Sequence, residues 1–260
     1  MKQKMKWNSY ISKKYRNDSS LFYEIIENFD SLGEIIFQER NVLRKIEHSV
    51  LGTLAVKSFK KPHLINQLVY ANFRKSKASR SYFHAEILTS KDINTPKPIA
   101  FFEEINKFRI DSSFYFSNYF EYDFTFRELI EKRNMFADWE FILKEFVQFI
   151  FNVHENNILF QDLSPGNVLI KKNNEKKTYS FSLVDLNRMT FQSLSLDQRL
   201  QNFIRLSLTD EMIPIIAKEY AKYSNEDFNL IRKQLHIKNN KFIERKVIKN
   251  KIKKLLGKNS

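Results

Sequence analysis

The segment between Ile158 and Asn187 limits the possible folds of this chain more than any other feature. Its sequence, ILFQDLSPGNVLIKKNNEKKTYSFSLVDLN, places Asp162 five residues before Asn167, with a Pro-Gly turn between them. Two β-type runs follow, and the second ends on Asp185. The pattern predicts a loop followed by a β-hairpin, which together present three polar side chains.

These three side chains form the set that phosphoryl transfer from ATP requires. One carboxylate must orient or deprotonate the attacking hydroxyl, and an amide and a second carboxylate must hold Mg²⁺. Asp162 fits the first role, and Asn167 and Asp185 fit the second. A surface turn, a hairpin and two solvated acids would give the same local pattern, because D-x-x-x-x-N is a common sequence. The rest of the chain decides between the two interpretations.

Composition excludes several kinds of site. With 260 residues, 42% of them hydrophobic, the chain can build one large domain or two small lobes with a core. It has no cysteine, which excludes disulfides, thiolate zinc sites and thiol catalysis, and its five histidines form no H-E-x-x-H pair. Any metal is therefore expected to have oxygen ligands, as Mg²⁺ prefers. Without a signal-peptide core or a run of ~20 apolar residues, the expected location is cytoplasmic.

The net charge of +14 comes from the two ends of the chain. Residues 1–16 hold six bases and no acid, residues 236–260 hold nine bases and one acid, and the remainder is balanced. We therefore expect a basic N-terminal arm over residues 1–20 and a basic amphipathic tail over residues 236–260, both touching an anionic membrane surface. Nucleic acid is the rival partner, but few aromatic residues lie among these bases.

Hydrophobic periodicity predicts a β-rich N-lobe over residues 21–122 and a helical C-lobe over residues 123–235. Strands are expected over residues 34–40, 42–50, 53–59 and 113–120, and helices over residues 63–73 and 79–90. In the C-lobe, Thr125 and Glu128 have the spacing of a helix-capping box, and Asp138 precedes a long amphipathic helix. Further helices are expected over residues 196–208 and 211–235.

Lys57 lies in the third predicted strand, in the sequence LAVK. A lysine that alternates with apolar neighbours on a strand is usually a solvated residue. Here the sequence matches the V-A-I-K form, in which the lysine contacts ATP phosphates, and it precedes the Asp162 loop by about one lobe. The context favours the phosphate-binding interpretation.

The chain resembles the lipopolysaccharide kinase family, most closely its Kdo-kinase and InaA-like branch. The resemblance rests on RKSKASRSY (74–82), INTPKPIAFFE (93–103), DFTFREL (123–129), QDLSPGNVLI (161–170) and LVDLNRM (183–189). It implies an α+β, two-lobed protein-kinase-like fold with a β-rich N-lobe and a reduced helical C-lobe. It also implies ATP and Mg²⁺ as cofactors. The implied acceptor is a sugar hydroxyl, that of Kdo attached to lipid A at the inner face of the cytoplasmic membrane.

The resemblance also implies roles for individual residues. Lys57 would contact the ATP phosphates, Asp162 would be the catalytic base, and Asn167 and Asp185 would hold magnesium. The backbone from Asn118 to Phe120 would bind adenine. Two residues near the acceptor, Ser164 and Arg188, are candidate substrate contacts, and Arg188 could pair instead with Asp185.

This chain departs from protein kinases at two places near the nucleotide. It lacks G-x-G-x-x-G, so the turn containing Arg40 and Asn41 would cover the phosphates, with Arg40 as a direct contact. Glu86 is the only acid in the second predicted helix and is the candidate partner of Lys57, although a charged helix residue is solvated by default.

Other functions remain open at the level of sequence. One is a kinase of another small molecule or of protein, although the short region after Asp185 argues against a peptide substrate. The other is a pseudokinase, a membrane-bound interaction module that keeps the fold without the chemistry. The intact Lys57, Asp162, Asn167 and Asp185 argue against the pseudokinase, while the missing glycines argue for it.

Overall fold

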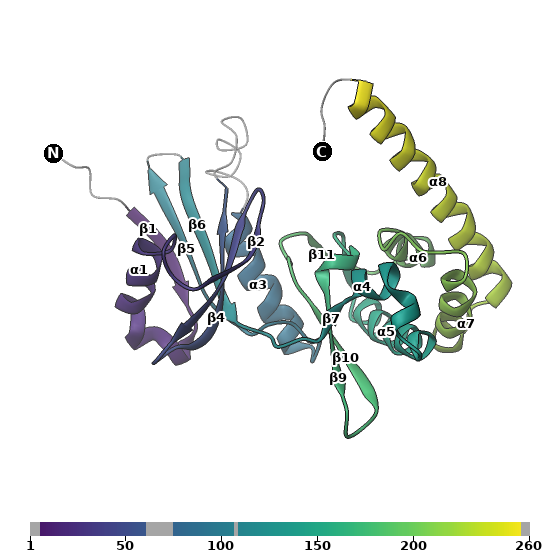
Figure 1. Ribbon diagram of the computed structural model, residues 1–260, viewed down its shortest axis with the longest axis horizontal. Coiled ribbons are helices and arrows are strands. Elements are labelled where there is room, and N and C mark those ends of the chain that lie inside the picture. The colour runs from purple at the N-terminus through teal and green to yellow at the C-terminus, as the bar shows by residue number, and fades with distance from the viewer. Residues whose placement is uncertain (1–5, 61–74, 107–108, 256–260) are drawn as a thin grey trace. The chain divides into compact units, whose positions relative to one another are not determined.

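The computed structural model describes residues 6–60, 75–106 and 109–255. The helix predicted over residues 63–73 lies outside these ranges. The chain forms two compact units, shown in Figure 1: Met1–Glu121 together with Asp185–Asn187, and Tyr122–Val184 together with Arg188–Ser260. The short segment Asp185–Asn187 thus belongs to the first unit, although the residues on both sides of it belong to the second.

A six-stranded antiparallel sheet is the centre of the first unit. Its strands have the order β1-β5-β6-β4-β3-β2. They are β1 (Lys6–Ile11), β2 (Glu34–Gln38), β3 (Val42–His48), β4 (Gly52–Phe59), β5 (Pro98–Asn106) and β6 (Arg109–Asn118). The helical elements of the unit are η1 (Lys13–Asp18), α1 (Ser19–Glu27) and α3 (Lys77–Ser90).

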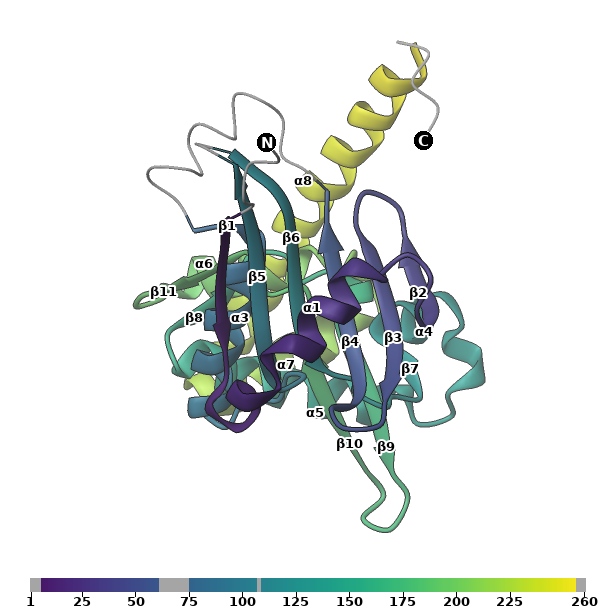
Figure 2. The same ribbon diagram turned by 90° about the vertical axis from the view of Figure 1, so that its left-hand side faces the viewer.

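The helices α1 and α3 cover opposite faces of this sheet, as Figure 2 shows. Side chains alternate along β4, so Leu54 and Val56 pack into the core that includes α1. Phe59 points to the other face, into the cluster formed with α3. Lys57 has the same parity as Phe59 and therefore lies on the α3 face. The predicted strands, and the helix expected over residues 79–90, are present.

The prediction of a basic N-terminal arm over residues 1–20 is wrong for residues 6–20, the part that the structure describes. Strand β1 pairs with β5 along its whole length, with Trp7 opposite Glu104. The Trp7 ring packs edge-on against Phe102, with 6.4 Å between ring centroids. The bases at the start of the chain masked the pattern of a short edge strand, in which Trp7 and Ile11 pack against the core.

The second unit is mainly helical. Its helical elements are α4 (Phe126–Glu131), η2 (Arg133–Met135), α5 (Trp139–Glu155), η3 (Pro165–Asn167), α6 (Leu196–Ile204), α7 (Met212–Ser224) and α8 (Phe228–Leu255). A three-stranded sheet has the order β10-β9-β7, from β7 (Phe124–Thr125), β9 (Val168–Asn173) and β10 (Thr178–Leu183). A two-stranded sheet pairs β8 (Ile158–Phe160) with β11 (Met189–Phe191).

The long amphipathic helix α5 is the core of this unit. The predicted apolar stripe is buried from Ile142 to Val153. At the start of α4 the predicted capping box is present, and the Glu128 carboxylate accepts a hydrogen bond of 2.8 Å from the Thr125 amide.

The C-terminal helices differ from the prediction. The segment expected to be helical over residues 211–235 is interrupted at Asn225, which has a left-handed backbone with φ of 57° and ends α7. Asp227 then caps α8 by accepting a hydrogen bond from the Leu230 amide. An Asn in the left-handed region is a common helix terminator, because its short polar side chain tolerates that conformation.

The predicted tail boundary at residue 236 is also wrong, because α8 continues through it without a break. Asn239 is buried and donates a hydrogen bond of 3.0 Å to the Leu208 carbonyl. Lys238 pairs with Asp197. The helix is therefore anchored to the second unit as far as Asn239. Among the residues that the structure describes, no helix is both long and apolar enough to cross a membrane.

Deleting residues 1–11 should destabilise the first unit, because it removes β1 together with Trp7 and Ile11, which pack against the core. Each large apolar side chain contributes about 1.5–3 kcal/mol when it is buried, so we expect a loss of roughly 3 kcal/mol or more. Urea unfolding followed by circular dichroism measures the change. The matched control is the equally long deletion of residues 250–260. If both deletions reduce stability equally, β1 is a dispensable arm.

Candidate active site

In the first unit, Lys57 forms an ion pair with Asp185. The Lys57 Nζ lies 2.7 Å from Asp185 Oδ1, and the exposed fractions of the two side chains are 15% and 32%. The side-chain nitrogen of Asn187 also donates to this oxygen, at 2.7 Å. Asp185 has a left-handed backbone with φ of 60°, a conformation that Asp tolerates better than most residues. Both contacts use Oδ1, which leaves Oδ2 to bind a cation.

Helix α3 contacts the segment around Asp185 through His84. Its Nδ1 lies 2.6 Å from the Leu186 carbonyl oxygen, and since a carbonyl can only accept, Nδ1 carries the proton. Burial is the main cause that lowers the pKa of His84. The residue that reaches this segment from α3 is therefore His84.

Glu86, the predicted partner of Lys57, does not pair with it. Its side chain is exposed, and its charge acts on Tyr82, whose pKa is raised first by burial and then by Glu86. Glu86 follows Tyr82 by one helical turn and lies on the same side of α3, but the ion pair of Lys57 is made with another carboxylate. The carboxylate partner of Lys57 is Asp185.

The other nucleotide contacts predicted in the first unit are on loops. Arg40 and Asn41 form the turn between β2 and β3, where Arg40 is exposed. The Asn41 side-chain oxygen accepts a hydrogen bond of 3.2 Å from the Lys60 amide, so it holds the turn against the end of β4. Of this pair, Arg40 remains the candidate for phosphate contact.

The structure leaves fewer backbone amides for adenine than the sequence predicts. The Asn118 amide donates to the Lys97 carbonyl at 2.9 Å, and the Tyr119 amide donates to the Thr53 carbonyl at 2.9 Å. Neither amide is therefore available to adenine. The backbone amide that remains from the predicted set is that of Phe120.

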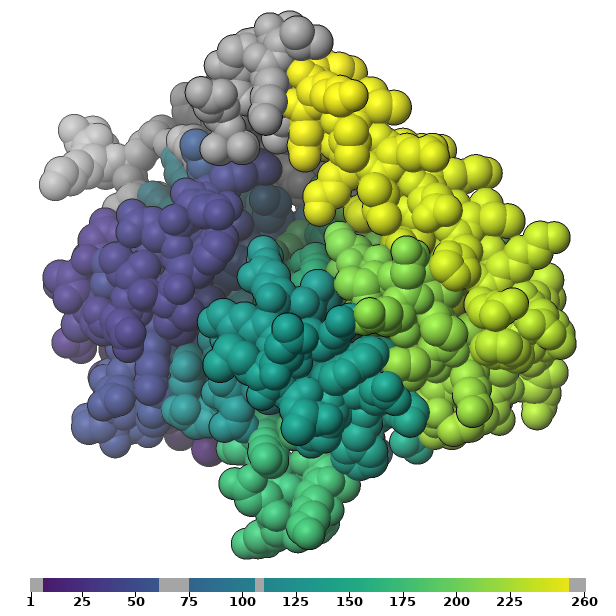
Figure 3. Space-filling model, turned by 45° about the vertical axis from the view of Figure 1, so that its right-hand side comes forward, coloured from purple at the N-terminus to yellow at the C-terminus, as the bar shows by residue number. Residues whose placement is uncertain are grey.

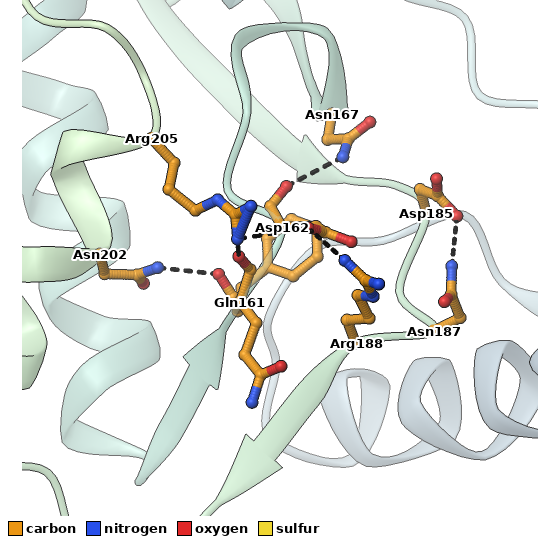
Figure 4. A network of polar contacts seen from close by, with 9 residues as sticks. Gln161, Asp162, Asn167, Asp185, Asn187, Arg188, Asn202 and Arg205 are labelled. Carbon is orange, nitrogen blue, oxygen red and sulfur yellow. Dashed lines mark hydrogen bonds and ion pairs between the residues drawn. The ribbon is translucent and has the colours of Figure 1, made fainter. Parts of the chain in front are cut away.

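In the second unit, Asp162 lies in a tight loop between β8 and η3 (Figure 4). Its carbonyl oxygen accepts hydrogen bonds from the Ser164 amide at 2.6 Å and from the Asn167 side-chain nitrogen at 2.9 Å. The Ser164 carbonyl accepts from the Asn167 amide at 2.9 Å. These bonds explain the five-residue spacing, because Asn167 closes the turn onto the backbone of Asp162. They also direct the Asn167 side-chain oxygen away from the loop.

A buried polar network holds this loop to the helices. The Asn202 side-chain nitrogen donates to the Phe160 carbonyl at 2.8 Å, and its oxygen lies 3.1 Å from His154 Nε2. Because the amide oxygen can only accept, His154 carries its proton on Nε2. Nδ1 then accepts from the Tyr220 hydroxyl, at 3.0 Å. Burial lowers the pKa of His154 to about 4, although the bond to Asn202 opposes the shift.

Two arginines lie against the Asp162 carboxylate. The Nη1 atoms of Arg188 and of Arg205 are each 3.5 Å from Asp162 Oδ1. Arg205 Nη1 also donates to the Gln161 carbonyl, at 2.5 Å. Arg188 thus pairs with the predicted base, whereas the sequence had suggested Asp185 or substrate.

The residues present fit magnesium bound with nucleotide. In the second unit, the Val184 amide donates to the Asn167 carbonyl at 3.0 Å. In the described part of the chain there is no cluster of three or more His, Cys, Asp or Glu that could hold a metal alone. One carboxylate and one amide oxygen, completed by phosphate oxygens and water, are a donor set typical of Mg²⁺.

Sequence reasoning missed four residues of this region: His84, His154, Asn202 and Arg205. None of them lies in a motif, and each acts through a tertiary contact. The one available signal was that Asn202 and His154 are polar residues within otherwise apolar helix faces, a pattern that suggests a buried hydrogen bond.

Comparison with known proteins supports the fold. No model of a protein family matches the chain, and no curated protein matches it. Among solved structures, WaaP in complex with acyl carrier protein matches with a TM-score of 0.60 and 14% sequence identity, over 91% of this chain and 98% of that chain. The match confirms the predicted α+β, protein-kinase-like fold. It is the fold implied by the resemblance to lipopolysaccharide kinases.

The His154 network predicts a pH dependence of stability. Folded His154 takes up its proton only near pH 4, whereas unfolded His takes it up near the ordinary value of 6.5. Between these values the unfolded state binds more protons, so His154 makes stability fall as pH falls, by at most about 1.4 kcal/mol per pH unit. Urea midpoints measured from pH 7 to pH 4.5 should therefore decline less steeply in His154→Gln than in the parent.

The comparison of slopes isolates His154, because the parent and the variant share the other groups that face the imidazole, Glu155, Arg199 and Tyr220. His48→Gln, which changes a histidine at the end of β3 in the first unit, is the control for the removal of a histidine as such. Identical slopes for His154→Gln and the parent would show that His154 is not held neutral in the folded protein.

Proposed function

We propose that this chain is a kinase that uses ATP and Mg²⁺ to phosphorylate a hydroxyl of a lipopolysaccharide sugar, with Kdo attached to lipid A as the acceptor. The observation that carries the proposal is the arrangement of Asp162. Its backbone is fixed by Asn167 and by the buried contact of Asn202 with Phe160, while its carboxylate is 23% exposed. A carboxylate held rigidly and open to solvent suits a group that must meet a hydroxyl.

The chemistry is an exchange of one bond to phosphorus for another. Asp162 orients the acceptor hydroxyl and takes its proton as the oxygen attacks the γ-phosphorus. The bond between that phosphorus and the oxygen bridging to the β-phosphate breaks, and ADP leaves with the electron pair. Lys57 binds the phosphates of ATP, and Asp185 and Asn167 would hold magnesium. The bound metal supplies neutralisation of the charge that develops on the phosphate oxygens.

Two features favour a small-molecule acceptor over a protein. Gln161 occupies the position before the catalytic Asp, where protein kinases carry an arginine that reads a phosphorylated loop. After Asp185, the part of the chain that the structure describes contains only the short β11 and the helices α6 to α8. The fold shared with WaaP agrees with the resemblance to sugar kinases of lipopolysaccharide.

The exposed half of α8 supports a peripheral membrane location on the cytoplasmic side. From Lys241 to Ile252 all side chains but that of Phe242 are exposed, and Figure 3 shows this yellow part of the helix at the surface. The exposed apolar residues are Ile243, Val247, Ile248 and Ile252. Five bases stand beside a single acid, Glu244. A basic helix with exposed apolar residues is attracted to an anionic bilayer surface.

The function is tested with purified protein, labelled ATP and Kdo-bearing lipid A, with label sought on the sugar. Asp162→Asn should lower turnover by roughly 10²–10⁴-fold, the usual contribution of a positioned base. It should keep the thermal shift that Mg-ATP produces. Asp185→Asn, which preserves the left-handed backbone but removes the charge, should lose that shift. A protein that binds Mg-ATP but labels no more sugar than Asp162→Asn is a pseudokinase or a kinase of another acceptor.

Deleting residues 241–260 should weaken binding to vesicles that contain anionic lipid and leave activity on a soluble Kdo glycoside unchanged. The cut follows the last anchored residue, Asn239, so folding is preserved. Co-sedimentation with vesicles measures the binding. A second variant, with Lys246, Lys249 and Lys251 changed to Gln, keeps the length of the helix and should show the same loss. High salt should mimic both, because it screens surface charge. If vesicle binding persists in both variants, another surface binds the membrane.

A further inference from the structure

We propose that Arg205 and Arg188 form a binding site for an oxyanion carried by the acceptor, a carboxylate or a phosphate next to the hydroxyl that Asp162 activates. The proposal rests on the kinase function and names the class of its acceptor. Arg205 lies at the end of α6, outside any recognisable motif. Only the folded structure shows that it lies beside Asp162. Together the two arginines are called the arginine pair.

The contacts of the arginine pair with Asp162 are longer than strong charge-assisted hydrogen bonds, so pairing with Asp162 is not the main role of these arginines. A charge-assisted hydrogen bond between arginine and carboxylate is about 2.7–2.9 Å long, but both Nη1 atoms lie 3.5 Å from the same oxygen, Oδ1. Neither guanidinium makes the two-pronged contact that its planar shape allows. Since the contacts found in the described chain use Nη1 alone, the remaining N–H groups can bind a ligand.

The charges at this point do not balance. Two guanidinium groups face one carboxylate, which gives a surplus of one positive charge beside Asp162. Three other acids of the second unit each pair with a base of their own. Asp197 pairs with Lys238, Glu155 with Arg199, and Glu211 with Arg133. The surplus is also accessible, because the Arg188 and Arg205 side chains are 58% and 45% exposed.

The position of Arg205 favours the acceptor over the nucleotide as its ligand. Figure 4 shows Arg205 reaching Asp162 from the side of Gln161, away from the Asn167 amide. Asn167 is the predicted magnesium ligand and so marks the side of the loop that faces the phosphates of ATP. A ligand on the Arg205 side of Asp162 is therefore the molecule that presents its hydroxyl to the base.

The anion would position the acceptor and select it. A guanidinium fork binds a carboxylate or a phosphate in a fixed plane, so the neighbouring hydroxyl is held at a fixed angle to Asp162. A neutral sugar would leave the arginine pair partly desolvated without a partner, which costs affinity. The arginine pair thus distinguishes an acidic or phosphorylated sugar from a neutral one.

The test compares matched charged and neutral sugars. Binding is measured by calorimetry in the presence of magnesium and a non-hydrolysable ATP analogue. The first pair of ligands is a soluble Kdo glycoside and its carboxamide, and the second is a heptose phosphate and the unphosphorylated heptose. The parent should bind the charged member of at least one pair roughly 10- to 100-fold more tightly, the range of a charge-assisted hydrogen bond.

Arg205→Gln should remove most of this preference, and Arg205→Lys, which keeps the charge without the planar fork, should restore part of it. Arg232→Gln, an equal charge change on an exposed arginine of α8, should leave it intact. A parent that binds charged and neutral sugars equally overturns the proposal. So does a preference that Arg205→Gln leaves unchanged.

Turnover shows whether the arginine pair acts on the anion of the acceptor or on the transferred phosphoryl group. If Arg205 serves the acceptor anion, Arg205→Gln lowers kcat/KM for the charged sugar and not for its neutral counterpart. An equal fall for both would assign Arg205 to the phosphoryl group or to support of the loop through the Gln161 carbonyl, and would overturn the proposal. If no sugar is phosphorylated but the charge preference in binding is present and depends on Arg205, the anion site stands and the proposed kinase function fails.

Discussion

The side-chain amide of Asn202 is the contact on which the arrangement around Asp162 depends. It donates to the carbonyl of Phe160, two residues before Asp162, and accepts from His154 on α5. A buried amide is stable only when its polar groups are satisfied, and then it fixes its partners in one geometry. Because helices hold the loop by its backbone, the carboxylate of Asp162 is not needed to support it and can face solvent and ligand.

The parts of the fold that could be predicted are those specified by local sequence. The stripe of α5 and the capping box of Thr125 need only the residues on their own helix. Strand β1 could not be recognised, because it gains its stability from β5, which lies far along the chain. The boundary of the tail was misplaced for a similar reason, since only the tertiary contact of Asn239 with Leu208 shows where the helix leaves the second unit.

Some residues of the candidate site could likewise be predicted from local sequence, and others could not. Asp162 and Asn167 could be found because their hydrogen bond requires one spacing in the sequence. Lys57 could be found because its strand matches the V-A-I-K form and precedes the Asp162 loop by about one lobe. The partner of Lys57 could not be predicted, since it is Asp185, which lies 128 residues further along the chain. Arg205 could not be predicted, because it is a single arginine at the end of a helix. Only the fold shows that it contacts the Asp162 loop.

The membership of Asp185–Asn187 in the first unit has a consequence for synthesis of the protein. The strands of the first unit leave the ribosome by Asn118, so the sheet can form early. Asp185 is made only after β7 to β10 of the second unit, and until then Lys57 lacks its carboxylate. Domains usually fold as the chain emerges, N-terminal first. Here the N-terminal unit completes its Lys57–Asp185 pair only after the chain has passed through much of the second unit, so an incomplete chain does not contain this pair.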